Sequence, residues 1–492
     1  MSAPATTASA PLDRAVIRVA MVVVLGSIMS ILDTTIVNVA LDELSRQLGS
    51  TIDQIQWIVT GYLLSLAAVI PVTGWAARRF GERRLYLTSI VLFTLGSVLC
   101  GLAWSTGSLI AFRVVQGVGG GMILPVGQMI LARAAGPQRM GRVMSVISIP
   151  IVMAPILGPT IGGLVLEHLG WRWIFFVNIP VGIAAVLYGL RQLPRDNGSR
   201  EDAGRLDLAG LALLATGLVG ITYGLAETGL SGGLSGPRVV LPLLIGLTLT
   251  TTFVLRARRI ERPLLDVRLY RNRAFAAASL TTFCLGGALF GASVLMPLYF
   301  QTVRAQDAVT TGLLLAPQGI GVAISMFFSA RAADRIGGGR LSLAGVLLTA
   351  AATVPFAFFG ASSSYWLIGA TMVVRGAGIG MAFVPAMTAA FAAMTPAQIP
   401  DATPQLNVLQ RVGGSIGTAI LAVILQSNIN NLAVPTPEGI ASAFNTAYWW
   451  ALAITLAAVV PAVVLVRAEA AARRRARAPD EAAELVPEAV AT

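Results

Sequence analysis

The fold class is decided by one stretch near the N-terminus, VIRVAMVVVLGSIMSILDTTIVNVA, at residues 16–40. An α-helix needs about 20 predominantly apolar residues to cross the hydrocarbon core of a bilayer. This stretch is long enough to do so, and Asp33 is its only acid. Apolar runs of the same kind recur along the chain. We therefore predict an all-α integral membrane protein.

The composition indicates the same class. Hydrophobic residues make up 55% and charged residues 12% of the 492 positions, whereas soluble domains carry about 25% charged residues. A soluble protein of this length would lack charged surface, and a disordered chain would be far less apolar. We count fourteen apolar runs, at 16–40, 54–76, 85–104, 108–131, 140–165, 172–190, 206–226, 239–255, 275–298, 310–330, 341–360, 365–388, 403–426 and 444–466.

The basic residues predict how these runs are oriented. The net charge is +12, and all 35 basic residues are arginines. If the N-terminus is cytoplasmic, 28 arginines fall on the inner side and four on the outer side, and Arg113, Arg375 and Arg411 lie within runs. Because cytoplasmic loops carry an excess of Lys and Arg, we predict that both termini are cytoplasmic. The basic charge then requires no nucleic-acid partner.

Two pairs of segments indicate an internal duplication. GWAARRFGERRL (74–85) resembles ARAADRIGGGRL (330–341), and FRVVQGVGGGMILP (112–125) resembles VRGAGIGMAFVP (374–385). We therefore predict two related six-helix bundles, at 1–200 and 263–470. Two additional transmembrane helices lie between them, at 201–262. A charged, Ala-rich tail at 471–492 is expected to be disordered or loosely helical.

Several motifs together resemble one family, the major facilitator superfamily, and within it the fourteen-span drug:proton antiporters of the EmrB/QacA type. Besides 74–85 and 112–125, the motifs are LDTTIVNVAL (32–41), PILGPTIGG (155–163), WRWIFFVNIP (171–180) and PLLDVRLYRNRAF (263–275). The resemblance implies a multi-pass plasma-membrane protein that works by alternating access. It also implies a proton gradient as the energy source, no cofactor, and function as a monomer.

Asp33 and Arg113 are the candidate proton-coupling residues. An acid in hydrocarbon costs at least about 2.5–3.5 kcal/mol, so Asp33 should face a cavity or a partner. Arg113 lies a few residues into its run from the outer side, at a depth similar to that of Asp33. The two charges could therefore pair. Arg113 would then tune Asp33 rather than carry the proton, because arginine does not deprotonate in proteins. Alternatively, Asp33 bonds to Thr34, Thr35 or Asn38, and Arg113 is a structural pin.

The 74–85 loop departs from the family pattern, with Arg78 in place of the usual Asp and Glu82 in place of a usual Arg. Opposite charges four residues apart could pair with reversed polarity. We predict that this loop is a conformational latch at the cytoplasmic mouth, although a pure topology signal remains an alternative. The latch residues are Gly74, Arg78, Arg79, Gly81, Glu82, Arg83 and, in the C-terminal copy, Asp334.

The fifth run carries the antiporter motif of the family. Its prolines can kink a helix, and its glycines let another backbone approach closely. The motif could form a hinge or seal between the two bundles, or it could serve ordinary packing. Its residues are Pro155, Gly158, Pro159, Gly162 and Gly163.

Polar and aromatic side chains within the runs predict a mixed apolar and polar cavity, which suits an amphipathic small-molecule substrate. The candidates are Asn38, Gln56, Trp57, Tyr62, Gln116, Gln128, Asn178, Tyr299, Gln301, Gln318, Asn407 and Gln410.

The sequence favours a proton-driven exporter of hydrophobic or amphipathic small molecules, as in multidrug or toxic-metabolite efflux. No GxxxxGK[ST] loop for ATP is present. An uptake carrier for a small metabolite is the alternative, and the antiporter motif argues against it. An enzyme is disfavoured, and no metal site is predicted, because His168 is the only histidine and the two cysteines lie far apart.

Overall fold

The computed structural model describes residues 13–135, 158, 161–195, 204–231, 236–432, 434 and 436–484. Every regular element in these ranges is helical. Thirteen helical segments there are long and apolar enough to cross a membrane, and each matches one of the fourteen predicted runs. The remaining run, 140–165, falls largely outside the described residues. The all-α membrane fold is therefore confirmed, and the count of fourteen stays a prediction.

Within the described residues, the N-terminal half contains nine helical elements. They are α1 (Arg14–Val39), α2 (Leu41–Leu48), α3 (Ile52–Val69), η1 (Ile70–Val72), α4 (Thr73–Phe80), α5 (Glu82–Gly101), α6 (Thr106–Ala135), α8 (Trp171–Phe176) and α9 (Asn178–Gln192). The C-terminal half contains η3 (Val267–Arg271), α12 (Arg273–Thr302), α13 (Ala308–Ile336), α14 (Gly338–Thr353), η4 (Val354–Phe358), α15 (Tyr365–Ala392), α16 (Ile399–Asn430), α17 (Pro437–Ala457) and α18 (Val459–Glu484).

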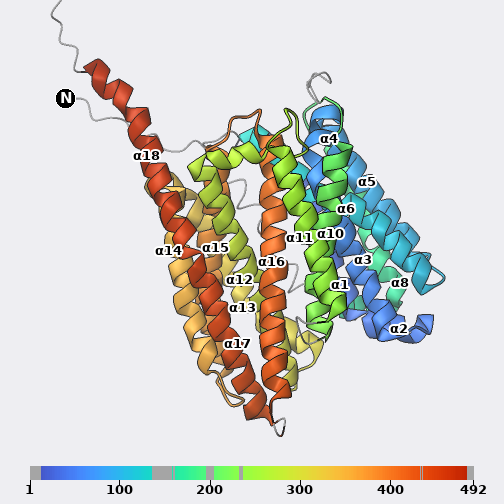
Figure 1. The fold of residues 1–492 in the computed structure, drawn as a ribbon. Coiled ribbons are helices and arrows are strands. Elements are labelled where there is room, and N and C mark those ends of the chain that lie inside the picture. Colours follow the sequence, from blue (N-terminus) through green and yellow to red (C-terminus); the bar gives the residue numbers. More distant parts are fainter. Residues whose placement is uncertain are drawn as a thin grey trace, which may run out of the picture.

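The two helices between the halves are α10 (Leu208–Ser231) and α11 (Pro237–Ala257), which pack on each other (Figure 1). Helix α10 also contacts α3 of one half and α16 of the other, so the pair lies along the seam between them. Arg256 of α11 donates two hydrogen bonds to Asp207, at 2.7 and 2.8 Å. Burial raises the pKa of the Asp207 carboxyl, but the bonds from Arg256 and from the Gly210 N–H outweigh it, and the pKa falls below its ordinary value.

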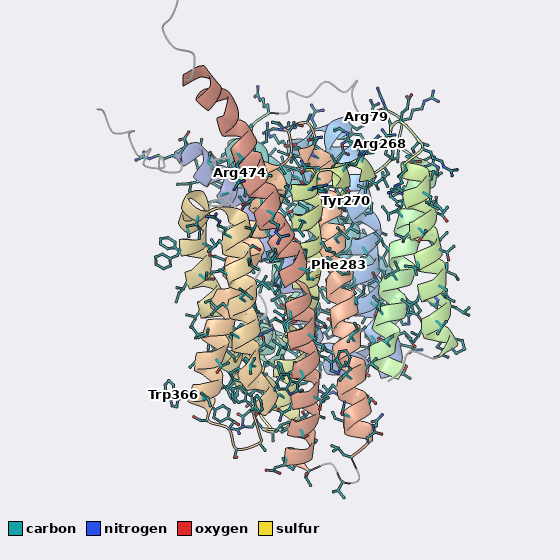
Figure 2. All side chains as sticks on the ribbon, turned by 60° about the vertical axis from the view of Figure 1, so that its left-hand side comes forward. Arg79, Arg268, Tyr270, Phe283, Trp366 and Arg474 are labelled. Atoms are coloured by element: carbon teal, nitrogen blue, oxygen red, sulfur yellow. The ribbon has the colours of Figure 1, made fainter. Side chains whose placement is uncertain are left out.

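The arginines mark one end of the bundle. Figure 2 shows Arg79, Arg268 and Arg474 at the same end, with Trp366 at the other. We call the first the inner end and the second the outer end. Helix α18 extends past the bundle at the inner end, where α4 also lies (Figure 1). The tail from residue 471 onward, expected to be disordered or loosely helical, continues α18 as far as Glu484. Its Ala, Arg and Glu residues are strong helix formers.

The hydrophobic core is arranged differently at the two ends. One cluster of buried residues runs through both halves towards the inner end, including Met129 and Leu131 of α6 with Ala402 and Leu406 of α16. At the outer end, the described residues form two separate clusters. One lies around Trp171 within the N-terminal half, and the other lies around Phe356 and Tyr448 within the C-terminal half. Among the described residues, the buried hydrophobic core therefore joins the two halves towards the inner end, whereas each outer cluster belongs to one half.

Glycines in α5 and α6 let these two helices pack closely against each other. A Cβ added at Gly96 of α5 would lie 2.6 Å from the Cα of Gln116, and one at Gly119 would lie 2.6 Å from the backbone N of Phe93. Real Cβ atoms do not approach other atoms this closely, so the backbones of α5 and α6 could not pack as they do with larger residues. This close packing brings the polar face of α6 against α5.

Candidate functional site

The centre of the N-terminal half holds a completely buried ion pair. The Asp33 carboxylate on α1 and the Arg113 guanidinium on α6 lie 2.5 Å apart, and their side chains are 0% and 1% exposed. Two residues at matching depth on neighbouring helices are thus in direct contact, as the sequence predicted. Thr34 and Thr35 instead donate to backbone carbonyls of their own helix, those of Ile31 and Leu32.

Amide side chains complete the coordination of Asp33. Gln116 on α6 donates to one carboxylate oxygen at 2.9 Å, and Asn178 at the start of α9 donates to the same oxygen at 3.2 Å. Both amides also donate to the hydroxyl of Ser97 on α5, at 2.6 and 3.0 Å. Four helices therefore contribute to one hydrogen-bond network around a single carboxylate.

Arg113 is held by three further groups. Its guanidinium donates to the Gln116 amide oxygen at 2.7 Å and to the Ile58 carbonyl at 3.3 Å. The guanidinium also stacks 4.0 Å from the centre of the Tyr62 ring. A buried ion pair is tolerated only when the remaining donors and acceptors are also satisfied. Here both oxygens of Asp33 and the Nε and Nη1 atoms of Arg113 are hydrogen-bonded, which supports the charges in the membrane interior.

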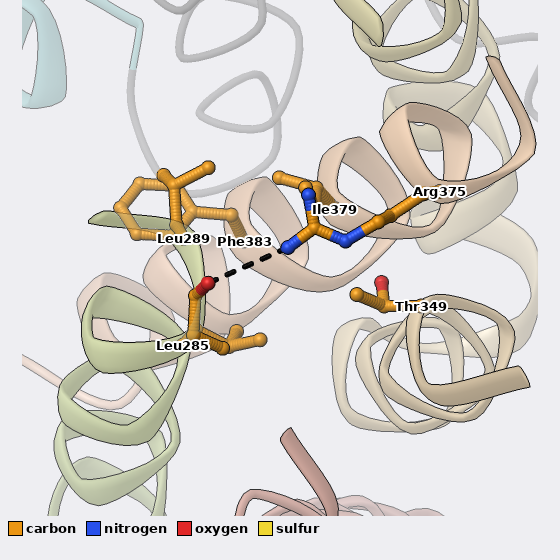
Figure 3. A pocket seen from close by; sticks show the side chains of 7 residues that line it. Leu285, Leu289, Thr349, Arg375, Ile379 and Phe383 are labelled. Carbon is orange, nitrogen blue, oxygen red and sulfur yellow. Dashed lines mark hydrogen bonds between the residues drawn. The ribbon is translucent and has the colours of Figure 1, made fainter. Parts of the chain in front are cut away.

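Among the residues that the structure describes, the equivalent arginine of the C-terminal half has no carboxylate beside it. Arg375 on α15 is 1% exposed and donates to the Gln318 amide at 3.0 Å, the Thr353 hydroxyl at 3.3 Å and the Ala288 carbonyl at 3.5 Å. Figure 3 shows its guanidinium reaching towards α12 across a small pocket. The pocket measures about 10 Å³, the space of a single water molecule. These contacts indicate a structural role for Arg375, in which it holds α15 to α12, α13 and α14.

The two halves meet at the inner end through α4 and α16. Arg78 of α4 and Asp401 of α16 form an ion pair at 2.6 Å, with side chains 24% and 22% exposed. Gly74 lies directly against the Pro400 carbonyl, so a Cβ there would clash. One level deeper, Asn407 of α16 donates to Gln128 of α6 at 2.7 Å, and both side chains are buried.

The predicted partnership of Arg78 with Glu82 is wrong. Gly81 has φ +89° and separates α4 from α5, so the two side chains lie on different helices. Arg78 turns towards Asp401, whereas Glu82 forms an ion pair with Arg133 at 3.1 Å. The latch residue Arg83 donates to the Leu190 carbonyl of α9. Arg79 lies exposed at the inner end, and the side chain of Asp334 lies outside the described residues.

The described part of the antiporter motif packs mainly on α1. A Cβ at Gly158 would clash with Thr35, and one at Gly162 would lie 3.3 Å from Ile36. Gly163 has more space, with Val309 of the other half nearest at 3.8 Å. These glycines therefore contact the helix that carries Asp33, two or three residues from the carboxylate. Pro155 and Pro159 lie outside the described residues.

The predicted cavity residues do not form one group. Tyr62, Gln116 and Asn178 join the Asp33 network, Gln128 and Asn407 bridge the halves, and Gln318 holds Arg375. Trp57 stacks on Tyr223 of α10 with ring centres 5.6 Å apart, and the Tyr299 hydroxyl donates to the Gly360 carbonyl within the outer C-terminal cluster. Asn38 and Gln301 are exposed, and Gln56 and Gln410 are partly exposed.

Sequence reasoning missed two residues of the site. Ser97 has no charge and no distinctive motif, although a small polar residue in an apolar run is a weak sign of a buried hydrogen bond. Asp401 lies in the first turn of its helix, near the start of the span. An acid in the first turn of a helix has an ordinary explanation in the helix dipole, and its partner is 323 positions away in the sequence.

The fold and the buried charged site together define an integral membrane transporter. The chain belongs to the Major Facilitator Superfamily, whose sequence profile matches residues 23–418. It is 41% identical over 423 residues to a multidrug resistance protein B homolog of Mycobacterium tuberculosis, covering 85% of this chain and 78% of that protein. It is 31% identical to the multidrug export protein EmrB of Escherichia coli, covering 80% and 77%.

A solved structure has the same fold. The proton:xylose symporter XylE superimposes with a TM-score of 0.62 at 14% identity, covering 90% of this chain and 96% of that one. The protein is therefore a transporter of small molecules and not an enzyme. It is a multi-pass protein of the plasma membrane.

Proposed function

We propose that this transporter is a proton-coupled antiporter that exports hydrophobic or amphipathic small molecules by alternating access. Relatives named for multidrug resistance and multidrug export support the class of substrate. The observation that carries the proposal is the buried pair of Asp33 and Arg113. Protons, a small-molecule substrate and the lipid bilayer are the partners that it requires, and one copy of the chain holds the complete network.

The network supplies a physical reason for coupling. Protonation of Asp33 removes the only carboxylate beside Arg113 among the described residues and leaves a buried guanidinium uncompensated. Loss of one partner of a buried ion pair costs about 3–5 kcal/mol. A conformation that hydrates Arg113, or gives it another partner, is then favoured. A proton on Asp33 can therefore bias the equilibrium between the two orientations of the halves.

The inner seam supports the second part of the proposal. Gly74, the Arg78–Asp401 pair and the Gln128–Asn407 hydrogen bond join the halves at the inner end. Substrate can reach the centre from the cytoplasm only if these contacts part. We propose that they form the inner gate and that the described conformation is the one open to the outside.

Inside-out membrane vesicles test the proposal. The parent protein should accumulate an amphipathic dye in the vesicles when the lumen is made acidic, and Asp33→Asn should abolish this accumulation. Asp33→Asn should still bind dye and exchange it down its own gradient. Glu438→Gln removes an exposed acid and is the matched control. Accumulation by Asp33→Asn equal to the parent would overturn proton coupling at this residue. Dye movement only out of the vesicles would favour the alternative, an uptake carrier.

A further inference from the structure

Arg411 is the third arginine within the spans, and nothing described so far uses it. It lies near the middle of α16 and is partly exposed. It is within electrostatic range of Tyr62 on α3. Within the described residues, no hydrogen bond or ion pair reaches its guanidinium.

The helix geometry determines where Arg411 points. Residues spaced by three or four along a helix share a face, so Asn407 and Pro400 lie on the same face of α16 as Arg411. Both residues contact the N-terminal half, Pro400 at Gly74 and Asn407 at Gln128. Arg411 therefore faces the N-terminal half one turn beyond the Asn407 contact, on the outer side of the inner gate. Ser415 and Thr418 continue the same face and are also partly exposed.

No carboxylate of the C-terminal half can neutralise this charge. Five of the six acids between 263 and 470 lie near a helix end or in a connection: Asp266, Asp307, Asp334, Asp401 and Glu438. The sixth, Glu469 of α18, accepts a hydrogen bond from the Gly339 N–H at the start of α14. Residues 136–160, which lie mostly outside the described ranges, contain no Asp or Glu at all. Asp33 is already bound by Arg113. Arg411 is thus an uncompensated cation at membrane depth, where a charge should have a functional reason.

We propose that Arg411 binds the anionic group of an amphipathic substrate, a carboxylate or a sulfonate, between the two halves. The planar guanidinium matches these groups through two parallel hydrogen bonds. Arg375 cannot serve in this way, because it is fully buried and already bonded on three sides. The proposal rests on the proposed export function and adds the charge of the substrate. Exchange of one inward proton for one outward monoanion would move two positive charges inward, so transport would be electrogenic.

Two dyes with the same aromatic skeleton test the proposal. 8-Anilino-1-naphthalenesulfonate is an anion, and N-phenyl-1-naphthylamine is its neutral analogue without the sulfonate. Binding of each to the full-length protein in lipid nanodiscs is measured by equilibrium dialysis, with empty nanodiscs subtracted. Arg411→Gln should weaken binding of the sulfonate about tenfold or more, as expected for loss of a charge-assisted hydrogen bond. Binding of the neutral dye should change less than about twofold, a difference within ordinary context effects.

Two further variants complete the experiment. Arg411→Lys keeps the charge but not the two parallel hydrogen bonds, so its affinity for the sulfonate should lie between those of Arg411→Gln and the parent. Arg238→Gln removes an exposed arginine and should bind both dyes as the parent does. Unchanged sulfonate binding by Arg411→Gln would overturn the proposal, as would an equal loss for both dyes. The Asp33→Asn vesicle assay is read separately. If it shows no proton coupling while Arg411→Gln still discriminates the dyes, the antiport proposal fails and the anion site stands.

Discussion

Arg78 and Asp401 join the two halves of the transporter at the inner end, with 2.6 Å between guanidinium nitrogen and carboxylate oxygen. Both side chains are about a quarter exposed, so the pair contributes on the order of 1 kcal/mol. A contact of this strength can hold one orientation of the halves and still break in every transport cycle. Arg78 has the opposite charge to the Asp that is usual at this position in the family. It still forms an ion pair, and its partner is Asp401 on α16.

We expect Arg78→Glu to lower export about threefold to tenfold, because two carboxylates would then face each other across the gate. Asp401→Arg in the same protein should restore a large part of the activity. Export of an amphipathic dye into inside-out vesicles is the measurement, with membrane insertion checked by immunoblot. Arg191→Glu reverses an exposed charge at the end of α9 and is the control. A double variant no better than Arg78→Glu alone would exclude the pair as a latch.

The second prediction concerns the contact between the antiporter motif and α1. Gly158→Ala places a methyl group against Thr35, whereas Gly163→Ala places one where the nearest atom is 3.8 Å away. Overpacking of this kind typically costs about 1–3 kcal/mol. Gly158→Ala should therefore slow export at least about fivefold, and Gly163→Ala should leave it near the parent rate. Dye binding to both variants, measured in nanodiscs, separates slowed movement from misfolding. Equal rates for the two variants would contradict the packing argument.

The third prediction compares two arginines at corresponding positions. Arg113→Gln leaves the Asp33 carboxylate buried without its cation, so gradient-driven export should fall more than about tenfold. Arg375→Gln removes a cation that has no carboxylate beside it in the described structure, so export should stay within about threefold of the parent. Initial rates of dye accumulation, normalised to the amount of inserted protein, provide the comparison. Similar losses in both variants would mean that the two halves contribute equally to proton coupling.

The sequence predicted the spans well, because the length of an apolar run is a direct requirement of the bilayer. It also indicated that Asp33 and Arg113 could pair, since both lie at a similar depth within their spans, and the structure shows this pair rather than the alternative partners of Asp33. It did not predict α2, a short polar helix outside the membrane with no long apolar run to reveal it. The contacts of Asp401 with Arg78 and of Ser97 with Asn178 join residues far apart in the chain, and no local pattern encodes them.

The last prediction concerns the amide of Asn178. This amide donates to the buried Asp33 carboxylate at 3.2 Å. Asn178→Ala leaves the carboxylate with one donor fewer. A hydrogen bond to a charged group contributes about 1.5–3 kcal/mol, and about 1.4 kcal/mol corresponds to a tenfold change in rate. Gradient-driven export by Asn178→Ala should therefore fall about tenfold, whereas downhill exchange of dye should stay near the parent rate. Initial rates of both processes in vesicles, normalised to the amount of inserted protein, provide the measurement. Asn407→Ala removes a buried amide of the same kind that binds Gln128 at the inner gate instead, so its driven export and its downhill exchange should change together. A parallel change of both rates in Asn178→Ala would show that the variant reports general loosening of the bundle rather than the support of Asp33.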